Sequence, residues 1–141
     1  MPDPARPGVA AAMANIAREL AAALADWSEG PLIHGDLGPW NMLQCEDGRL
    51  VVIDFGEAKF GNPYFDYATL LGGVINHTPA ERRAAVCRDF LRELDCDRGK
   101  LLEQLRRWAE QGVQYWQEKN KKMVARFYHA LNWAEENLYD L

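Results

Sequence analysis

Residues 32–43 read LIHGDLGPWNML, and residues 48–56 read GRLVVIDFG. The apolar runs in these two segments are short and rich in residues that favour strands, and a Glu-Asp-Gly turn signal stands between them. We therefore predict a small β-hairpin with strands at 41–43 and 50–53. The polar residues HGDLGPWN form a loop before this hairpin, and an Asp-Phe-Gly triplet lies at its exit.

The hairpin is expected to bring these two polar segments side by side. Asp36 precedes Asn41 by five residues, and Asp54 follows Asp36 by eighteen. Kinases have this order and spacing, with an Asp and an Asn in one loop and a second Asp after a hairpin. A carboxylate at Asp54 and an amide oxygen at Asn41 are hard ligands suited to Mg²⁺. A carboxylate at Asp36 would orient an attacking hydroxyl and accept its proton.

Helices are predicted for most of the remaining sequence. The first is expected over residues 9–27, where apolar residues recur at three- and four-residue steps, and the sequence Ser-Glu-Gly-Pro ends it. Asp66 is expected to cap a second helix to about residue 75. A capping box that begins at Thr78 opens a third, to about residue 94. Asp97 caps a fourth, and a fifth carries Met123, Phe127, Leu131, Ala134 and Leu138. Strands and helices do not alternate, so we predict an α+β, mostly α-helical fold.

The segment from residue 32 to residue 73 resembles the aminoglycoside phosphotransferase and choline kinase-like family. In that family the catalytic loop typically reads HGD, and the metal-binding Asp lies in an ID-F/W-G-x-A context. A G-D/N-P-x-x-D-x-A segment follows, matched here by GNPYFDYA at 61–68. The resemblance implies a protein-kinase-like C-terminal lobe in which the small hairpin carries the catalytic and metal loops.

The resemblance also implies a role for each matching residue. Asp36 would be the catalytic base, and Asn41 and Asp54 would be metal ligands. His34 and Asp66 would be structural supports that brace the catalytic loop.

Two further residues are assigned to the surroundings of this site. Glu57 is expected near the metal or the mouth of the substrate site. Trp40 is expected either to pack under the catalytic loop or to shape the acceptor site.

The function implied is an ATP- and Mg²⁺-dependent phosphotransferase, with GTP as another possible donor, acting on a hydroxyl of a small molecule such as an aminoglycoside or related metabolite. A cationic acceptor fits this expectation. Gly35 replaces the arginine of protein kinases, and no long activation segment follows Gly56, so protein substrates are disfavoured.

The nucleotide-binding lobe of such enzymes supplies a glycine-rich strand-turn-strand and a lysine before the catalytic loop. Before His34 the sequence contains only Gly8 and Gly30, and its first lysine is Lys59. We therefore expect residues 1–8 to be a leader or linker stub, residues 9–141 to form the C-terminal lobe, and the N-terminal lobe to be absent.

Several explanations for the missing nucleotide-binding lobe stay open. The chain is a fragment or split-gene product, a truncated reading frame, or a catalytically incomplete, pseudokinase-like binding module. A simple helical interaction domain with accidental motifs is a further alternative. A lobe without its partner exposes apolar surface, so a separate N-terminal lobe or a homodimer is expected to cover the face around the catalytic loop and the first helix.

Composition limits the other classes of function. Residues 1–70 carry 4 basic and 10 acidic side chains, which argues against binding to a nucleic acid backbone. No apolar run has the length of a membrane span, so no membrane association is expected. The 3 cysteines include no CxxC pair, and the N-terminus does not read as a signal peptide. These features predict a cytoplasmic protein without disulfides or a zinc site.

Overall fold

The computed structural model describes residues 1–141. Its helices are α1 (Val9–Ala23), α2 (Pro63–Asn76), α3 (Ala80–Leu94), α4 (Arg98–Trp116) and α5 (Lys121–Asn137), with the 3-10 helices η1 (Pro39–Asn41) and η2 (Leu138–Asp140). The strands form two antiparallel pairs: β1 (Leu32–Ile33) with β4 (Lys59–Phe60), and β2 (Met42–Gln44) with β3 (Leu50–Val52). The fold is therefore α+β and mostly α-helical, which confirms the predicted class.

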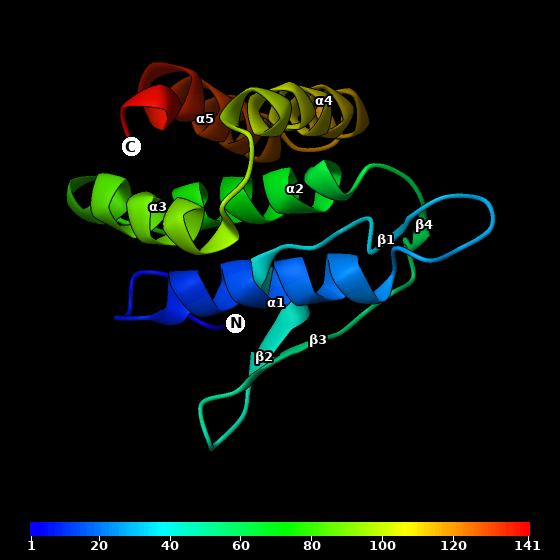
Figure 1. Cartoon of the computed structure of the whole chain (residues 1–141). Helices are drawn as coiled ribbons and strands as arrows, with labels where there is room; N and C mark the ends of the chain where they lie inside the picture. Colours follow the sequence, from blue (N-terminus) through cyan, green and yellow to red (C-terminus); the bar gives the residue numbers. More distant parts are fainter.

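The helices are arranged in layers around α2 (Figure 1). On one side α1 lies along α3, and on the other side α4 packs against α5. Ten of the 14 residues of α2 are buried, on all sides of the helix. A helix that is apolar and buried all round lies at the centre of a domain. α2 is therefore the support on which the neighbouring helices and the catalytic loop rest.

Two adjacent glycines allow these neighbours to approach α2 closely. A Cβ atom on Gly72 would lie 2.5 Å from a ring carbon of Trp108 in α4. A Cβ atom on Gly73 would lie 2.3 Å from the ring of Pro39, at the start of η1. Because non-bonded atoms do not pack at such distances, any larger residue at these positions would push α4 or η1 away.

The end of α1 differs from the prediction. The helix ends at Ala23, not Trp27, because the chain turns to begin β1 and the carbonyl of Leu24 accepts a hydrogen bond from the N–H of Leu32 at 3.0 Å. Trp27 consequently lies outside the buried face, and half of its surface is exposed.

Both predicted caps around α2 and α3 were wrong. Asn62 caps α2, accepting a hydrogen bond from the N–H of Tyr64, so the helix begins before Asp66. The carboxylate of Asp66 is used elsewhere, as described below. The expected capping box at Thr78 does not form, because its hydroxyl donates back to the carbonyl of Val74 at 2.6 Å and α3 begins only at Ala80.

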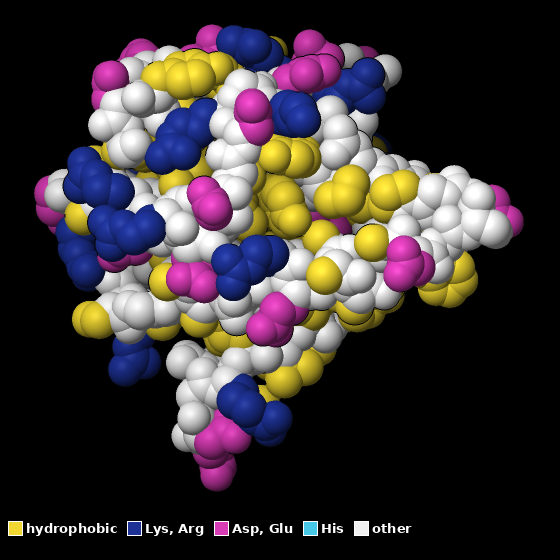
Figure 2. All heavy atoms as spheres, in the orientation of Figure 1, with side chains coloured by type: hydrophobic (Ala, Val, Ile, Leu, Met, Phe, Trp, Pro, Cys, Tyr) yellow, Lys and Arg dark blue, Asp and Glu magenta, His cyan; other side chains and the backbone are white.

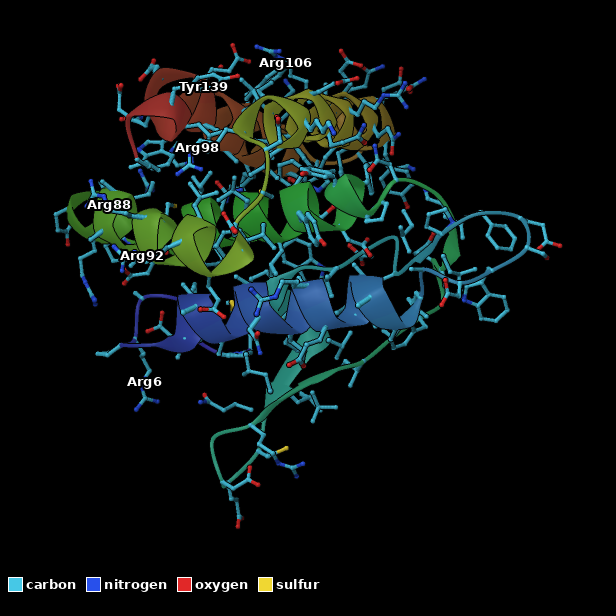
Figure 3. All side chains as sticks on the ribbon, in the orientation of Figure 1. Arg6, Arg88, Arg92, Arg98, Arg106 and Tyr139 are labelled. Carbon is cyan, nitrogen blue, oxygen red and sulfur yellow. The ribbon has the colours of Figure 1, made fainter.

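The two C-terminal helices agree with the predictions. Asp97 caps α4, with its carboxylate accepting from the N–H of Lys100 at 2.9 Å. α5 covers the expected region and is capped by Asn120. Arg98, labelled in Figure 3, donates to the carbonyls of Leu138 and Leu141 at 3.2 and 3.0 Å. This side chain ties the C-terminal turn to the start of α4.

The predicted hairpin is present, with Met42 opposite Val52 and Gln44 opposite Leu50. Its tip projects away from the helices (Figure 1) and carries acidic and basic side chains (Figure 2). The pairing of β1 with β4 was not predicted, because each strand has only two residues and they are far apart in the sequence.

The first eight residues form turns that pack against the helices. Pro2, Pro4 and Ala5 are buried, and the N–H of Ala5 donates to the carboxylate of Asp3 at 2.9 Å.

None of the helices combines the length and the apolar character that crossing a bilayer requires.

Candidate active site

The catalytic loop, residues 34–41, begins with a clamp formed by Asp66. The N–H groups of His34 and Gly35 donate to the two carboxylate oxygens of Asp66 at 2.7 and 3.0 Å. Burial raises the pKa of this carboxyl above its usual range, and the two hydrogen bonds partly oppose the shift. Because Asp66 belongs to the first turn of α2, the central helix fixes where the loop starts.

The imidazole of His34 connects the catalytic loop to the end of β3. The N–H of Asp36 donates to Nδ1 of His34 at 3.1 Å, so Nδ1 is an acceptor. Nε2 therefore carries the hydrogen and donates to the carbonyl of Ile53 at 2.9 Å. The ring is fully buried and contacts Phe55, with centroids 4.7 Å apart.

The carboxylate of Asp36 is held in one orientation by two donors. The indole N–H of Trp40 donates to Oδ1 at 3.2 Å, and the amide of Asn41 donates to Oδ2 at 3.1 Å and to the Asp36 carbonyl at 2.9 Å. Burial raises the pKa of Asp36, and these two hydrogen bonds partly offset the rise. A half-buried carboxylate with a raised pKa, fixed by neighbours, is suited to accept a proton.

The catalytic loop touches the segment that follows β3. Gly35 has a φ of 89°, and a Cβ atom there would lie 2.2 Å from the carbonyl oxygen of Glu57. The charge of Glu57 also contributes to the raised pKa of Asp36. Glu57 therefore lies close to Asp36, while its predicted position near a metal or the mouth of the substrate site stays a prediction.

The metal loop, residues 54–58, carries the second predicted carboxylate. Asp54 has a φ of 59°, a left-handed conformation that is uncommon for residues other than glycine and recurs at functional sites. Its carboxylate is exposed and accepts one long hydrogen bond, from the N–H of Gly56 at 3.3 Å. The N–H of Ile53 donates to the carbonyl of Asn41 at 2.9 Å, which joins the two loops at their bases.

The side-chain oxygens of Asn41 and Asp54 are of the hard type that suits a magnesium ion. The amide nitrogen of Asn41 is occupied by Asp36, and its side-chain oxygen has no hydrogen-bond partner in the chain. No cluster of three or more His, Cys, Asp or Glu side chains stands at metal-binding distances. One amide oxygen and one carboxylate therefore leave most positions of a six-coordinate ion to phosphate oxygens and water, as is usual for Mg²⁺.

A cavity of about 480 Å³ opens next to Asp36. Its walls come from Met1, the catalytic loop, the end of α2, α4 and α5, and 6 of its 10 lining residues are hydrophobic. Its size is within the range of small-molecule sites. Trp40 lines this cavity and also contacts the helix at Gly73, where a Cβ atom would be 3.0 Å from the indole. Trp40 thus packs against α2 and also lines the cavity, and its role at an acceptor site stays a prediction.

Several residues around the cavity were not among the predicted site residues. Arg126 and Phe127 in α5 and His77 after α2 line it, as does Trp108 in α4. No local motif marks these positions, because they meet only when the helices pack. The glycine pair in α2 was also missed, although an adjacent Gly-Gly in a helical segment is a recognisable sign of close packing.

The comparisons with known proteins agree with this geometry. A family model described as the phosphotransferase enzyme family matches residues 3–108. The match covers 106 of the 141 residues and includes every predicted site residue, while α5 lies outside it. No curated protein matches the chain at a significant level.

Proposed function

Since the chain belongs to the phosphotransferase enzyme family, we propose that it is an ATP- and Mg²⁺-dependent lobe that transfers a phosphoryl group to a hydroxyl of a small molecule. GTP is an alternative donor. The observation that carries the proposal is the position of Asp36, which lines the 480 Å³ cavity while Trp40 and Asn41 hold its carboxylate.

In this proposal the acceptor hydroxyl enters the cavity and donates a hydrogen bond to Asp36. The carboxylate orients the hydroxyl oxygen and accepts its proton as the phosphoryl group is transferred. The raised pKa of Asp36 brings it closer to that of the group it deprotonates. His34 and Asp66 act as positioning residues, because they fix the backbone of the loop without facing the cavity.

Asn41 and Asp54 would hold the magnesium ion. The ion would neutralise charge on the phosphate oxygens of the donor nucleotide. The open surface around Asp54 leaves room for a triphosphate, and Glu57 lies at the edge of the same region.

We further propose that the chain is equivalent to the C-terminal lobe of a protein-kinase-like fold, and that a nucleotide-binding lobe or a second copy of the chain covers its exposed apolar side. Trp27, Phe55 and Phe60 are between 45% and 51% exposed. Figure 2 shows hydrophobic atoms on the surface at the end of the molecule where β1 and β4 lie. Large exposed apolar side chains of this kind mark interaction sites.

The first test is the thermal stability of the chain with and without Mg²⁺ and millimolar ATP. A ligand that binds only the folded state raises the melting temperature by mass action. We expect a rise of a few degrees for the native chain and none for Asp54→Asn.

Asp26→Asn is the matched control, because it makes the same substitution at an exposed site in the loop after α1. It should respond as the native chain does. An equal shift in Asp54→Asn, or a shift that does not need Mg²⁺, would contradict the proposed metal site. Nucleotide binding without turnover of any acceptor, even with a nucleotide-binding lobe added, would favour a binding module instead.

A further inference from the structure

The side chains that line the cavity have an unusual charge balance for a site that accepts cations. Asp36 is the only acidic side chain among them, and the residues with a cationic group are Arg126 and Met1, which carries the terminal ammonium. Burial, together with the nearby charge of Arg126, lowers the pKa of His77 below its ordinary value, which disfavours a second positive side chain beside Arg126. If Asp36 is engaged with the acceptor hydroxyl, no other carboxylate that lines the cavity remains to pair with an ammonium group, although Glu57 and Asp3 lie close enough to influence Asp36 and His77.

Arg126 has a fixed backbone and a free guanidinium. Its carbonyl accepts a hydrogen bond from the amide of Asn76 at 3.1 Å, and the same amide side chain contacts Nδ1 of His129 at 2.9 Å. These contacts hold this part of α5 against the end of α2. The guanidinium itself makes no ion pair or hydrogen bond within the chain.

The remaining walls are mainly aromatic. The rings of Trp108 and Phe127 are 4.6 Å apart at a tilt of 55°, and Trp40 and His77 lie with their centroids 6.5 Å apart. Trp116 and Met123 add further apolar surface. Walls of this kind favour a ring-containing ligand body that fills the space between them.

We propose that the acceptor is a ring-containing alcohol that bears a carboxylate or similar anionic group, which pairs with Arg126. The assignment of its hydroxyl to Asp36 rests on the proposed function; the pairing with Arg126 does not. A planar carboxylate matches the fork of donors on a guanidinium and forms two parallel hydrogen bonds with it. A polycationic acceptor would place like charges together at this wall, so the expected acceptor differs from the cationic one inferred from the sequence.

The test compares three probes that share one ring and one hydroxymethyl group. They are 4-(hydroxymethyl)benzoate, its neutral methyl ester, and 4-(aminomethyl)benzyl alcohol, which is cationic. Titration calorimetry on the full chain should rank the anionic probe first and the cationic probe last, with about a tenfold difference in Kd between them.

Variants at Arg126 assign the preference to this side chain. Arg126→Gln should remove the difference between the anionic and neutral probes, and Arg126→Lys should keep part of it. Arg107→Gln is the control, because it removes an exposed arginine of α4 that does not line the cavity, and it should bind all three probes as the native chain does. Unchanged melting temperatures would show that each variant is folded.

Three results would overturn the proposal: tighter or equal binding of the cationic probe, an anion preference that survives Arg126→Gln, and no binding of any probe at millimolar concentration. None of these measurements uses a nucleotide. An Arg126-dependent anion preference together with an Asp54→Asn variant that shifts as the native chain does would therefore reject the proposed metal site and leave the anion site standing.

Discussion

The catalytic loop and the metal loop are in contact, yet the chain holds them very differently. In the catalytic loop His34, Leu37, Pro39 and Asn41 are buried. The carboxylate of Asp66 in α2 accepts from the loop backbone, and the His34 ring donates to the carbonyl of Ile53 after β3. In the metal loop every residue from 54 to 58 is exposed, and Asp54 keeps an uncommon left-handed backbone.

This difference indicates which parts of the site are ready before a ligand arrives. The orientation of the predicted base is set by internal hydrogen bonds, so it does not depend on the nucleotide. The metal loop has few contacts of its own, and exposed segments with few buried contacts have low local stability. We infer that its final conformation depends on what binds to it.

The largest expected effect comes from removing the clamp on the catalytic loop. Asp66→Ala leaves the N–H groups of His34 and Gly35 without their acceptor inside the protein, which should cost roughly 2–4 kcal/mol of the free energy of unfolding. Asp54→Gly should instead be neutral or stabilise by about 0.5–1 kcal/mol, because glycine adopts a positive φ without strain. Urea denaturation of both variants measures the contrast, and equal losses would contradict it.

A smaller effect is expected where the two loops touch. Gly35→Ala should destabilise by roughly 2–3 kcal/mol, since the new methyl group would overlap the carbonyl of Glu57 and the φ is positive. Gly48→Ala is a close control, because Gly48 has a φ of 88° and nothing within 4 Å of the added atom. It should show only the backbone cost of about 1 kcal/mol.

If denaturant unfolding gave the same loss in the free energy of unfolding for Gly35→Ala and Gly48→Ala, the close contact between the loops would not contribute to stability. A Gly35→Ala loss that disappears when Mg²⁺ and ATP are present would show that ligand binding separates the loops.

The smallest effect on stability concerns Asp36 and depends on pH. Burial raises the pKa of Asp36 in the folded state, so folding strengthens proton binding and the ionised carboxylate opposes folding. This cost is present above the raised pKa and disappears as the pH falls below the ordinary value near 3.8. Asp36→Asn should therefore melt slightly higher than the native chain at pH 7, with a difference that vanishes near pH 3.

Melting curves between pH 3 and pH 8 test this, with Asp26→Asn as the exposed control that should show no such trend. The same Asp36→Asn variant should lose about 10²-fold or more of any phosphoryl transfer. A variant that is less stable at pH 7 and recovers at low pH would reverse the sign and contradict the burial argument.

Local signals accounted for much of the fold. The hairpin around its Glu-Asp-Gly turn, the cap at Asp97 and the course of α4 and α5 follow from residues that are neighbours in the sequence. Distant partners explain two of the wrong predictions, whereas the capping box at Thr78 fails because its hydroxyl bonds to the carbonyl of Val74, only four residues earlier. The hydrogen bond from the N–H of Leu32 to the carbonyl of Leu24 accompanies the early end of α1. The carboxylate of Asp66 accepts from the N–H of His34 and so does not cap a helix.

The candidate site also has a part that local sequence predicts and a part that depends on tertiary packing. The motif placed Asp36, Asn41 and Asp54 on adjacent loops, and the structure joins those loops through the bond between Ile53 and Asn41. The acceptor side of the cavity was not predictable, because Arg126 and Trp108 come from different helices and no motif links them. Only tertiary packing, including the glycine pair in α2, brings them together.

The clamp at Asp66 also has a consequence for how the chain folds. Its partners lie 32 and 31 residues earlier in the sequence, so the loop that carries the base is completed only after a long-range closure. Contacts of this separation form late compared with local helices and hairpins. A short peptide that contains HGDLGPWN would therefore keep Trp40 and Asn41, the partners of the Asp36 carboxylate, but would lack the clamp that holds the start of the loop.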